Sequence, residues 1–307
     1  MVSQPGYDRP PSPPTTRPWP PTGQPLMNRA VRGSTPRITF KLVTAAAALE
    51  EGTSPRRPKF WTPAWHTYYD SPQPQCWLYR QEGKTHGLET VSEAIADSCN
   101  IFFYDAGRRV GIATLGQYAH LLGLGAKTGI ELAGEQAGVV AGPEYTASVG
   151  GTWYEGSVLS AAIGQENNRF TPLQLAHMTA TLVGDGNRWQ VHLLHQVEGV
   201  DPQPRVSLGQ VNLSQENVAA IQEGMLAVTQ TGSLAAAFQD LPFQAGAKTG
   251  SAQVTGEENA NAVLVCFAPY DDPQIALAIV AEQGGSGSAL GTVAAQTLSA
   301  WAGKAGL

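Results

Sequence analysis

The first half of the chain contains several apolar runs typical of helices, separated by segments rich in glycine and proline. Residues 53–88 show no period and predict an irregular segment with a short strand pair. An alanine-rich run at 40–49 favours a helix that is stopped by glycine shortly afterwards. Residues 90–93 (Thr-Val-Ser-Glu) have the spacing of a capping box and indicate a second helix start. The apolar run after Asn100 predicts a further helix that ends near Gly111. Ser98 therefore falls at a break between two helices.

The second half predicts two more helices and then a sheet. Thr171 precedes Pro172 as a capping hydroxyl before a first-turn proline, and Ser214 is expected to cap a helix with a buried apolar face. Toward the C-terminus, β-rich runs at 245–255, 261–270 and 274–284 are separated by turn residues and predict neighbouring antiparallel strands. A final helix at about 290–301 covers one face. This order predicts an α+β fold, with helices packed on an antiparallel sheet.

Composition narrows the classes of function. At 307 residues with 42% hydrophobic content, the chain can bury a core, and its net charge of -6 without a basic run gives no footprint for nucleic acid. The three cysteines and six histidines show no metal-ligand spacing, so we predict no metal and no cofactor. Residues 9–25 are proline-rich and predict an extended surface segment. We find no signal peptide and no apolar run of about 20 residues.

Three short motifs occur in a set order that suits acyl transfer by a serine enzyme. They are Thr39-Phe40-Lys41 at a helix start, Ser98-Cys99-Asn100 between helices, and Lys248-Thr249-Gly250-Ser251 on a β-rich run. Lys-Thr-Gly also occurs at 127–129, but that copy follows a helix within a loop. The strand context therefore assigns the third motif to Lys248.

These motifs, together with "NRAVRGSTPRITFKLVTAAAALEEG", "ETVSEAIADSCNIFFYDAG", "GLGAKTGIELAGE", "AAIGQENNRFTPLQLAHMTATL" and "CFAPYDDPQIALAIVAE", resemble the transpeptidase domain of class B-like penicillin-binding proteins. The resemblance runs over nearly the whole chain. It implies one β-lactamase/transpeptidase-like domain over residues 1–307, with a helical subdomain. The opening "MVSQPGYD" resembles the end of that domain's first strand, so we expect a domain truncated there.

The resemblance implies a role for each motif residue. Lys41 matches the lysine that takes the nucleophile's proton, and Ser98 would relay that proton while Asn100 binds the substrate's backbone amide. Lys248 would contribute positive charge. The remaining expected substrate contacts are Thr249, Ser251 and Gly250, whose lack of a side chain lets the strand lie close to the ligand.

One position departs from the family pattern. Ile38 stands three residues before Lys41, where the family has its nucleophilic serine, and isoleucine cannot form an acyl-enzyme. Ser34 would lie about 10.5 Å from Lys41 along a continuous helix, and Thr39 would project from another face. Glu166 also stands where the family usually has glycine. The sequence therefore leaves open whether the chain is an active enzyme.

The sequence supports three hypotheses about function. The leading one is a penicillin-binding, peptidoglycan D,D-transpeptidase-type domain in cell-wall synthesis and cell shape, impaired as an acyltransferase by Ile38. Its partners would be the D-Ala-D-Ala stem peptide, β-lactams and cell-wall assembly proteins, and the family's location is extracytoplasmic and membrane-anchored. The alternatives are a noncatalytic scaffold (a pseudoenzyme) and a β-lactamase-like hydrolase. A change in the reading frame explains Ile38 as well as evolved inactivity does.

Overall fold

The computed structural model describes residues 27–32, 38–54, 59–194, 197–201, 204–252 and 259–306. The proline-rich segment, the expected truncated strand and Ser34 lie outside these ranges. Helices in the described ranges are α1 (Lys41–Glu50), α2 (Trp77–Glu82), α3 (Val91–Ala96), α4 (Asn100–Val110), α5 (Ile112–Leu121), α6 (Pro143–Ser148), α7 (Ser157–Ala162), α8 (Pro172–Val183), α9 (Gln215–Gln230), α10 (Ala235–Phe238) and α11 (Gly291–Ala305), with 3₁₀ turns η1 (Ile38–Phe40) and η2 (Gly287–Leu290). Strands are β1 (Phe60–Thr62), β2 (Gly87–Glu89), β3 (Asn187–Trp189), β4 (Ser207–Gln210), β5 (Gly246–Ala252), β6 (Asn261–Ala268) and β7 (Ile275–Ala281).

The C-terminal strands form the antiparallel sheet that the sequence predicts. β6 lies between β5 and β7 and pairs with both in antiparallel register. Every residue of β6 is buried, which explains its continuous apolar run, because a strand covered on both faces has no polar side. The mixed helix and sheet architecture confirms the predicted α+β class.

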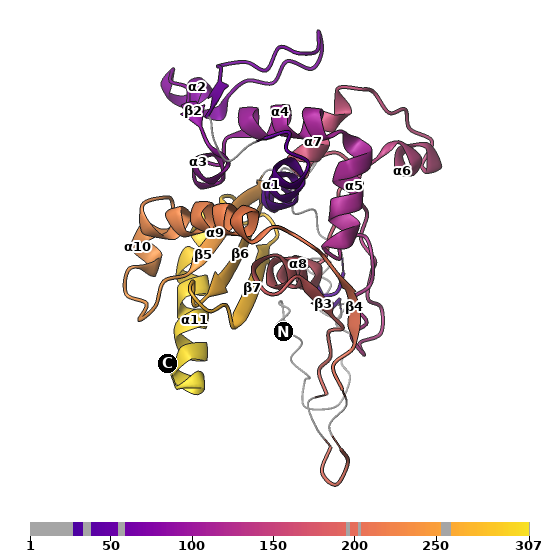
Figure 1. Cartoon of the computed structure of the whole chain (residues 1–307), viewed down its shortest axis with the longest axis vertical. Coiled ribbons are helices and arrows are strands. Elements are labelled where there is room, and N and C mark those ends of the chain that lie inside the picture. Colours follow the sequence, from indigo (N-terminus) through magenta and orange to yellow (C-terminus); the bar gives the residue numbers. More distant parts are fainter. Residues whose placement is uncertain are drawn as a thin grey trace, which may run out of the picture.

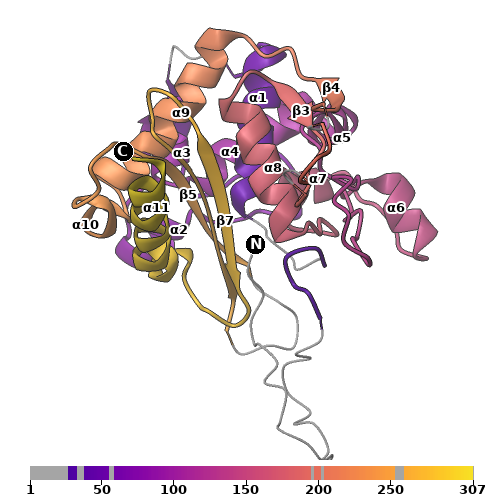
Figure 2. The same ribbon diagram turned by 90° about the horizontal axis from the view of Figure 1, so that it is seen from below.

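Helices cover both faces of this sheet. Alternate β6 residues belong to two different apolar cores: Val263, Val265 and Phe267 join the larger one, while Leu264 and Cys266 join a core shared with α11. Figures 1 and 2 show α11 on one side of the sheet and α8 on the other. The larger core continues into the helical part of the chain, which contains α1, α3, α4, α5 and α7.

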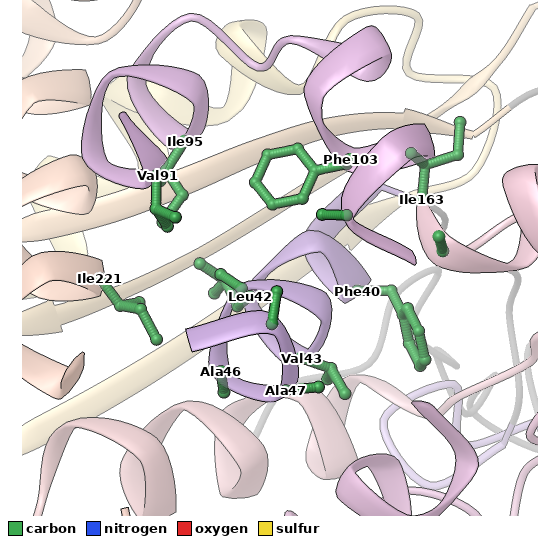
Figure 3. Packing of buried hydrophobic residues seen from close by; sticks show 14 of the residues in the cluster. Phe40, Leu42, Val43, Ala46, Ala47, Val91, Ile95, Phe103, Ile163 and Ile221 are labelled. Atoms are coloured by element: carbon green, nitrogen blue, oxygen red, sulfur yellow. The ribbon is translucent and has the colours of Figure 1, made fainter. Parts of the chain in front are cut away.

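Helix α1 runs through the middle of the larger core (Figure 3). Nine of its ten residues, Lys41 through Leu49, are buried. A helix that is surrounded on all sides needs small or apolar residues all round, and the alanine run supplies them without side-chain entropy loss. Phe40 stacks on Phe170 with ring centroids 5.9 Å apart, just before α1 begins. This packing fixes the start of α1, where Lys41 stands.

The long irregular segment between α1 and α3 contains more structure than the sequence predicts. The expected strand pair is present, as β1 and β2 pair antiparallel with Trp61 opposite Leu88. Helix α2 in this segment was not predicted, and neither was the two-stranded β3–β4 pair between α8 and α9. These elements are short, so they give too few positions for a period to appear. Within the described ranges, no helix has the length and apolarity that a membrane span requires.

The predicted capping signals at Thr90 and Thr171 are confirmed as complete capping boxes. Ser214 does occupy the N-cap position of α9, but its side chain makes no capping hydrogen bond, so that prediction was wrong in its chemistry. The N-cap position is fixed by the backbone, whereas the capping bond also requires the side chain to rotate toward the helix.

Thr171→Ala is expected to lower the free energy of unfolding by about 1 kcal/mol, because the Thr171 hydroxyl accepts a hydrogen bond from the Gln174 amide at 3.1 Å. Urea unfolding followed by circular dichroism measures this loss. Ser214→Ala is the matched control and should change stability by less than about 0.5 kcal/mol. Equal losses in the two variants would contradict the assignment.

Candidate active site

Lys41 is held at the buried start of α1 by the backbone and side chain of Ser98. Its Nζ donates to the Ser98 carbonyl oxygen at 2.7 Å and lies 3.1 Å from the Ser98 hydroxyl oxygen. Burial, and next the nearby charge of Lys248, hold the pKa of Lys41 well below its usual range. A lower pKa favours the neutral amine over the ammonium form. Such an amine can accept the proton of a neighbouring hydroxyl.

Ser98 lies at the predicted break, between the end of α3 and the start of α4. Its φ of 53° is in the left-handed region, which is uncommon for a residue with a side chain. Strained backbone of this kind persists where surrounding contacts hold it, and here Lys41 bonds both oxygens of Ser98. Asn100 is half-buried at the first position of α4. The first two motifs thus meet at one place.

The third motif lies along β5, where side chains alternate between the two faces of the sheet. Lys248 pairs with Val265 and is fully buried, whereas Thr249 and Ser251 share the other face and are half-buried. Burial lowers the pKa of Lys248 to about 7. Its Nζ has no hydrogen-bond partner among the described residues. A buried ammonium without a partner is costly, so an anionic ligand would satisfy it.

Ser251 connects β5 to the turn before α11. Its hydroxyl oxygen accepts a hydrogen bond from the Gly287 amide at 3.3 Å. An added Cβ at Gly287 would lie 2.5 Å from the carbonyl oxygens of both Gly250 and Val263. Only glycine therefore lets η2 lie this close to the strand that carries the third motif.

The second Lys-Thr-Gly copy, at 127–129, has a different environment. The Glu135 carboxylate accepts hydrogen bonds from the Thr128 amide (2.7 Å), the Thr128 hydroxyl (2.6 Å) and the Gly129 amide (3.3 Å). Gly129 has a φ of 82°, as a tight turn requires. These bonds hold residues 128–135 together as a loop. The second Lys-Thr-Gly copy therefore has a structural role in this loop and does not lie on a strand of the sheet.

Position 38 stands one 3₁₀ turn before Lys41. Residues 38–40 form η1, and in a 3₁₀ helix residues three apart are in line along the axis. The backbone therefore brings position 38 into register with the lysine, and the residue there is Ile38. Thr39 is fully buried, and its hydroxyl has no hydrogen-bond partner in the described part of the chain. A hydroxyl that is buried in the core is not accessible to a ligand.

Comparison with known proteins agrees with this geometry. The sequence model described as "Penicillin binding protein transpeptidase domain" matches residues 1–300. The chain belongs to the penicillin-binding protein transpeptidase family. The chain is 32% identical over 301 residues to peptidoglycan D,D-transpeptidase MrdA of Escherichia coli (strain K12), which covers 89% of the chain and 46% of that protein. It is 31% identical over 261 residues to stage V sporulation protein D of Bacillus subtilis (strain 168), covering 80% of the chain and 38% of that protein.

Solved structures place this transpeptidase domain among class B penicillin-binding proteins. The chain is similar to PBP2 of Pseudomonas aeruginosa, with a TM-score of 0.81, 30% identity, and coverage of 91% of the chain and 63% of that structure. PBP2 of Helicobacter pylori, solved in complex with MreC, gives a TM-score of 0.79 at 26% identity, with coverage of 92% and 52%. The chain spans about half the length of the curated relatives it matches.

Glu166 is the other position at which the sequence predicts a departure from the family pattern. Glu166 has a φ of 57°, a conformation that favours glycine. Glycine at this position would adopt the same turn without strain.

The structure gathers one set of polar residues that sequence spacing missed. Ligand atoms of His86, Glu89 and Cys99 all lie within 4.8 Å of one another, and the Cys76 sulfur is 3.4 Å from the His86 ring. Burial raises the pKa of Glu89 to about 7. Thiol, imidazole and carboxylate are donors that zinc takes in proteins, so this cluster could hold a metal ion. The residues come from different elements, and no sequence motif links them.

Proposed function

We propose that this chain is the transpeptidase-type, penicillin-binding domain of a peptidoglycan cross-linking protein, and that Ile38 impairs its acylation step. The observation that supports this most strongly is the contact between the buried Lys41 and Ser98, one 3₁₀ turn after the position of the missing nucleophile. Peptidoglycan lies outside the cytoplasmic membrane, so the domain would work there. The name of the MrdA relative, a peptidoglycan D,D-transpeptidase, describes the same activity.

The site residues divide the proposed work between proton transfer and substrate binding. Lys41, with its depressed pKa, would take a nucleophile's proton, and Ser98 would pass that proton to the leaving group. Asn100 would bind the backbone amide of a D-Ala-D-Ala stem peptide. The substrate carboxylate would bind Thr249 and Ser251 beside Gly250, close to the charge of Lys248. A β-lactam carries the same carboxylate and binds in the same place.

With isoleucine at position 38, the chain retains the residues proposed to bind the substrate but lacks the nucleophile. An acyl-enzyme requires a nucleophilic oxygen, which Ile38 lacks. The amide of residue 38 remains, so the pair of backbone N–H groups at positions 38 and 251 can still stabilise a negatively charged oxygen. The expected behaviour is noncovalent binding of stem peptide and penicillin without turnover.

Noncovalent binding of benzylpenicillin is expected to weaken as the pH rises through 7. With a pKa of about 7, Lys248 is protonated in about half of the molecules at pH 7 and about a tenth at pH 8, so affinity should fall about fivefold over that unit. Below pH 6 Lys248 is charged and this dependence disappears. Calorimetric titration of the chain with benzylpenicillin between pH 6 and pH 9 measures it.

The second Lys-Thr-Gly copy supplies the control for this experiment. Lys248→Met should weaken binding at pH 6 at least tenfold and abolish the pH dependence, whereas Lys127→Met should change neither. Asn100→Ala should weaken binding at every pH. Unchanged affinity in both Lys248→Met and Asn100→Ala would overturn the proposed site.

A noncatalytic scaffold is the second candidate, and Ile38 is the observation that favours it. Two similar structures are of assemblies: the complex of Helicobacter pylori PBP2 with MreC, and a peptidoglycan synthase complex. A scaffold would keep the fold for contacts with such cell-wall assembly proteins. Its site residues could change without effect on binding those partners, which separates it from the first proposal.

A further inference from the structure

A separate groove lies between the β1 segment and α4, outside the site described above. It encloses about 350 Å³ and is lined by residues of β1, the loop that follows it, the end of α1 and one side of α4. Three of the lining side chains are large aromatic groups left open to solvent: Trp61 is 64% exposed, Trp65 46% and Tyr68 64%. Exposed aromatic groups that gather around one hollow mark a binding surface.

The floor and rim of the groove differ in chemistry. Buried Ile101, Phe102 and Ala106 of α4 contribute apolar floor, and the hydroxyls of Thr53 and Thr62 and the ring of His66 add polar positions. A ligand here would meet flat apolar surfaces and a few hydrogen-bonding groups together. This combination suits a molecule that has both an apolar face and hydroxyl or amide groups.

One carboxylate and two guanidinium groups form a charge network at the groove. The Asp105 carboxylate accepts hydrogen bonds from Arg108 (2.8 Å) and Arg109 (2.6 Å), and His66 lies 3.9 Å from it. The Arg108 guanidinium also stacks on the Tyr68 ring, 3.8 Å from its centroid. One carboxylate neutralises only one of the two guanidinium groups, so the network has a net charge of +1, and Arg109 keeps further N–H donors beyond its bond to Asp105. The groove therefore offers hydrogen-bond donors together with the threonine oxygens as acceptors, which suits a ligand that carries hydroxyl or amide groups.

We propose that this groove binds the N-acetylated sugar backbone of a glycan strand. A sugar ring has an apolar C–H face that packs on an aromatic plane, and an edge of hydroxyls that bonds to carboxylate and threonine oxygens. The hydroxyl and acetamido groups of the polymer both donate and accept hydrogen bonds, as this lining requires. A volume of about 350 Å³ is at the lower end for ligand pockets, so the hollow takes one ring while neighbouring rings cross Trp61 and Tyr68.

The position of the groove fits the site next to it, and this step rests on the proposed function. Asn100 and Asp105 belong to α4 and are five residues apart, about 7.5 Å along the helix axis. A four-residue peptide extends up to about 14 Å. A stem peptide bound at Asn100 is therefore long enough to stay attached to a sugar in the groove. The groove would then orient the strand whose peptide the domain receives.

Calorimetric titration with chitotetraose, a neutral tetramer of N-acetylglucosamine, and with peptide-free glycan strands tests the proposal on the whole chain. Both probes should bind, and Trp61→Ala and Tyr68→Ala should each raise the Kd at least tenfold. Tyr154→Ala is the matched control, because Tyr154 is 69% exposed and does not line the groove. Benzylpenicillin affinity should be the same in all three variants.

The outcomes separate the two proposals. Glycan binding that Trp61→Ala and Tyr68→Ala leave unchanged, or no glycan binding by a chain that binds benzylpenicillin, would overturn the groove assignment alone. Glycan binding without benzylpenicillin binding would overturn the proposed function and leave the groove in place. Competition for the groove by an apolar peptide, with no response to chitotetraose, would show a protein-binding surface instead and also overturn the proposal.

Discussion

Ile38→Ser is expected to convert a chain that penicillin does not acylate into one that carries a stable covalent adduct. Position 38 is one 3₁₀ turn before Lys41, so a serine there would have its hydroxyl in register with a buried amine of depressed pKa. The serine oxygen would bond to the lactam carbonyl carbon, and the ring C–N bond would break. The hydroxyl proton would pass through Lys41 and Ser98 to the ring nitrogen.

Intact-mass spectrometry measures this gain directly, because ring opening loses no atoms and the mass rises by that of one penicillin. Ile38→Ala is the matched control: it shortens the side chain without adding an oxygen and should remain unmodified. Ile38→Ser combined with Lys41→Met should acylate at least a hundredfold more slowly, since the base is missing. The unmodified chain should show no adduct.

Each other outcome has a definite meaning. An adduct on the natural chain would show that another hydroxyl has replaced the serine, and peptide mapping would locate it among Ser34, Thr39 and Ser98. Absence of an adduct on Ile38→Ser would mean that more than the nucleophile is missing. That result would support the scaffold.

Gly287→Ala is expected to lower the free energy of unfolding by about 3 kcal/mol and to weaken benzylpenicillin binding. The new Cβ would lie 2.5 Å from two backbone carbonyl oxygens, those of Gly250 and Val263, and 2.6 Å from the Gly250 amide. Backbone atoms in a sheet cannot rotate away as a side chain can, so η2 must move off β5. That movement also breaks the bond from the Gly287 amide to Ser251.

Chemical unfolding and calorimetric binding of the same sample measure both effects. Gly303→Ala is the control, since Gly303 is within α11 and an added Cβ there meets nothing within 4 Å. Alanine is a better helix former, so this variant should gain up to about 1 kcal/mol. If Gly287→Ala proved as stable as Gly303→Ala, the close approach of η2 to β5 would be wrong.

The sequence predicts the parts of this domain that depend on local chemistry. A capping box needs only four consecutive residues, and the one predicted at Thr90 forms. The capping hydroxyl predicted at Thr171 also forms, as part of a second capping box. The three C-terminal strands follow from short β-rich runs between turn residues, and their antiparallel pairing follows from the short connections. The break at Ser98 and the absence of a serine at position 38 are also plain from the residues alone.

Properties that depend on distant parts of the chain were decided only by the tertiary structure. Whether Ser214 bonds the helix it precedes depends on its rotamer, and the depressed pKa of Lys41 depends on burial among several elements. The cluster of His86, Glu89 and Cys99 and the aromatic groove beside α4 each combine residues from separate elements.

Local sequence therefore determined the longer helices and the three C-terminal strands, where two of the helices are capped, and that isoleucine stands at position 38. The tertiary structure decided which residues meet. Lys41 and Ser98, 57 residues apart, share two contacts, and Lys248 is buried on the inner face of β5 while the other Lys-Thr-Gly copy folds onto Glu135. The physical reason is that capping and helix propensity act within a few residues, whereas burial and the pKa shifts it causes arise only when distant segments pack together.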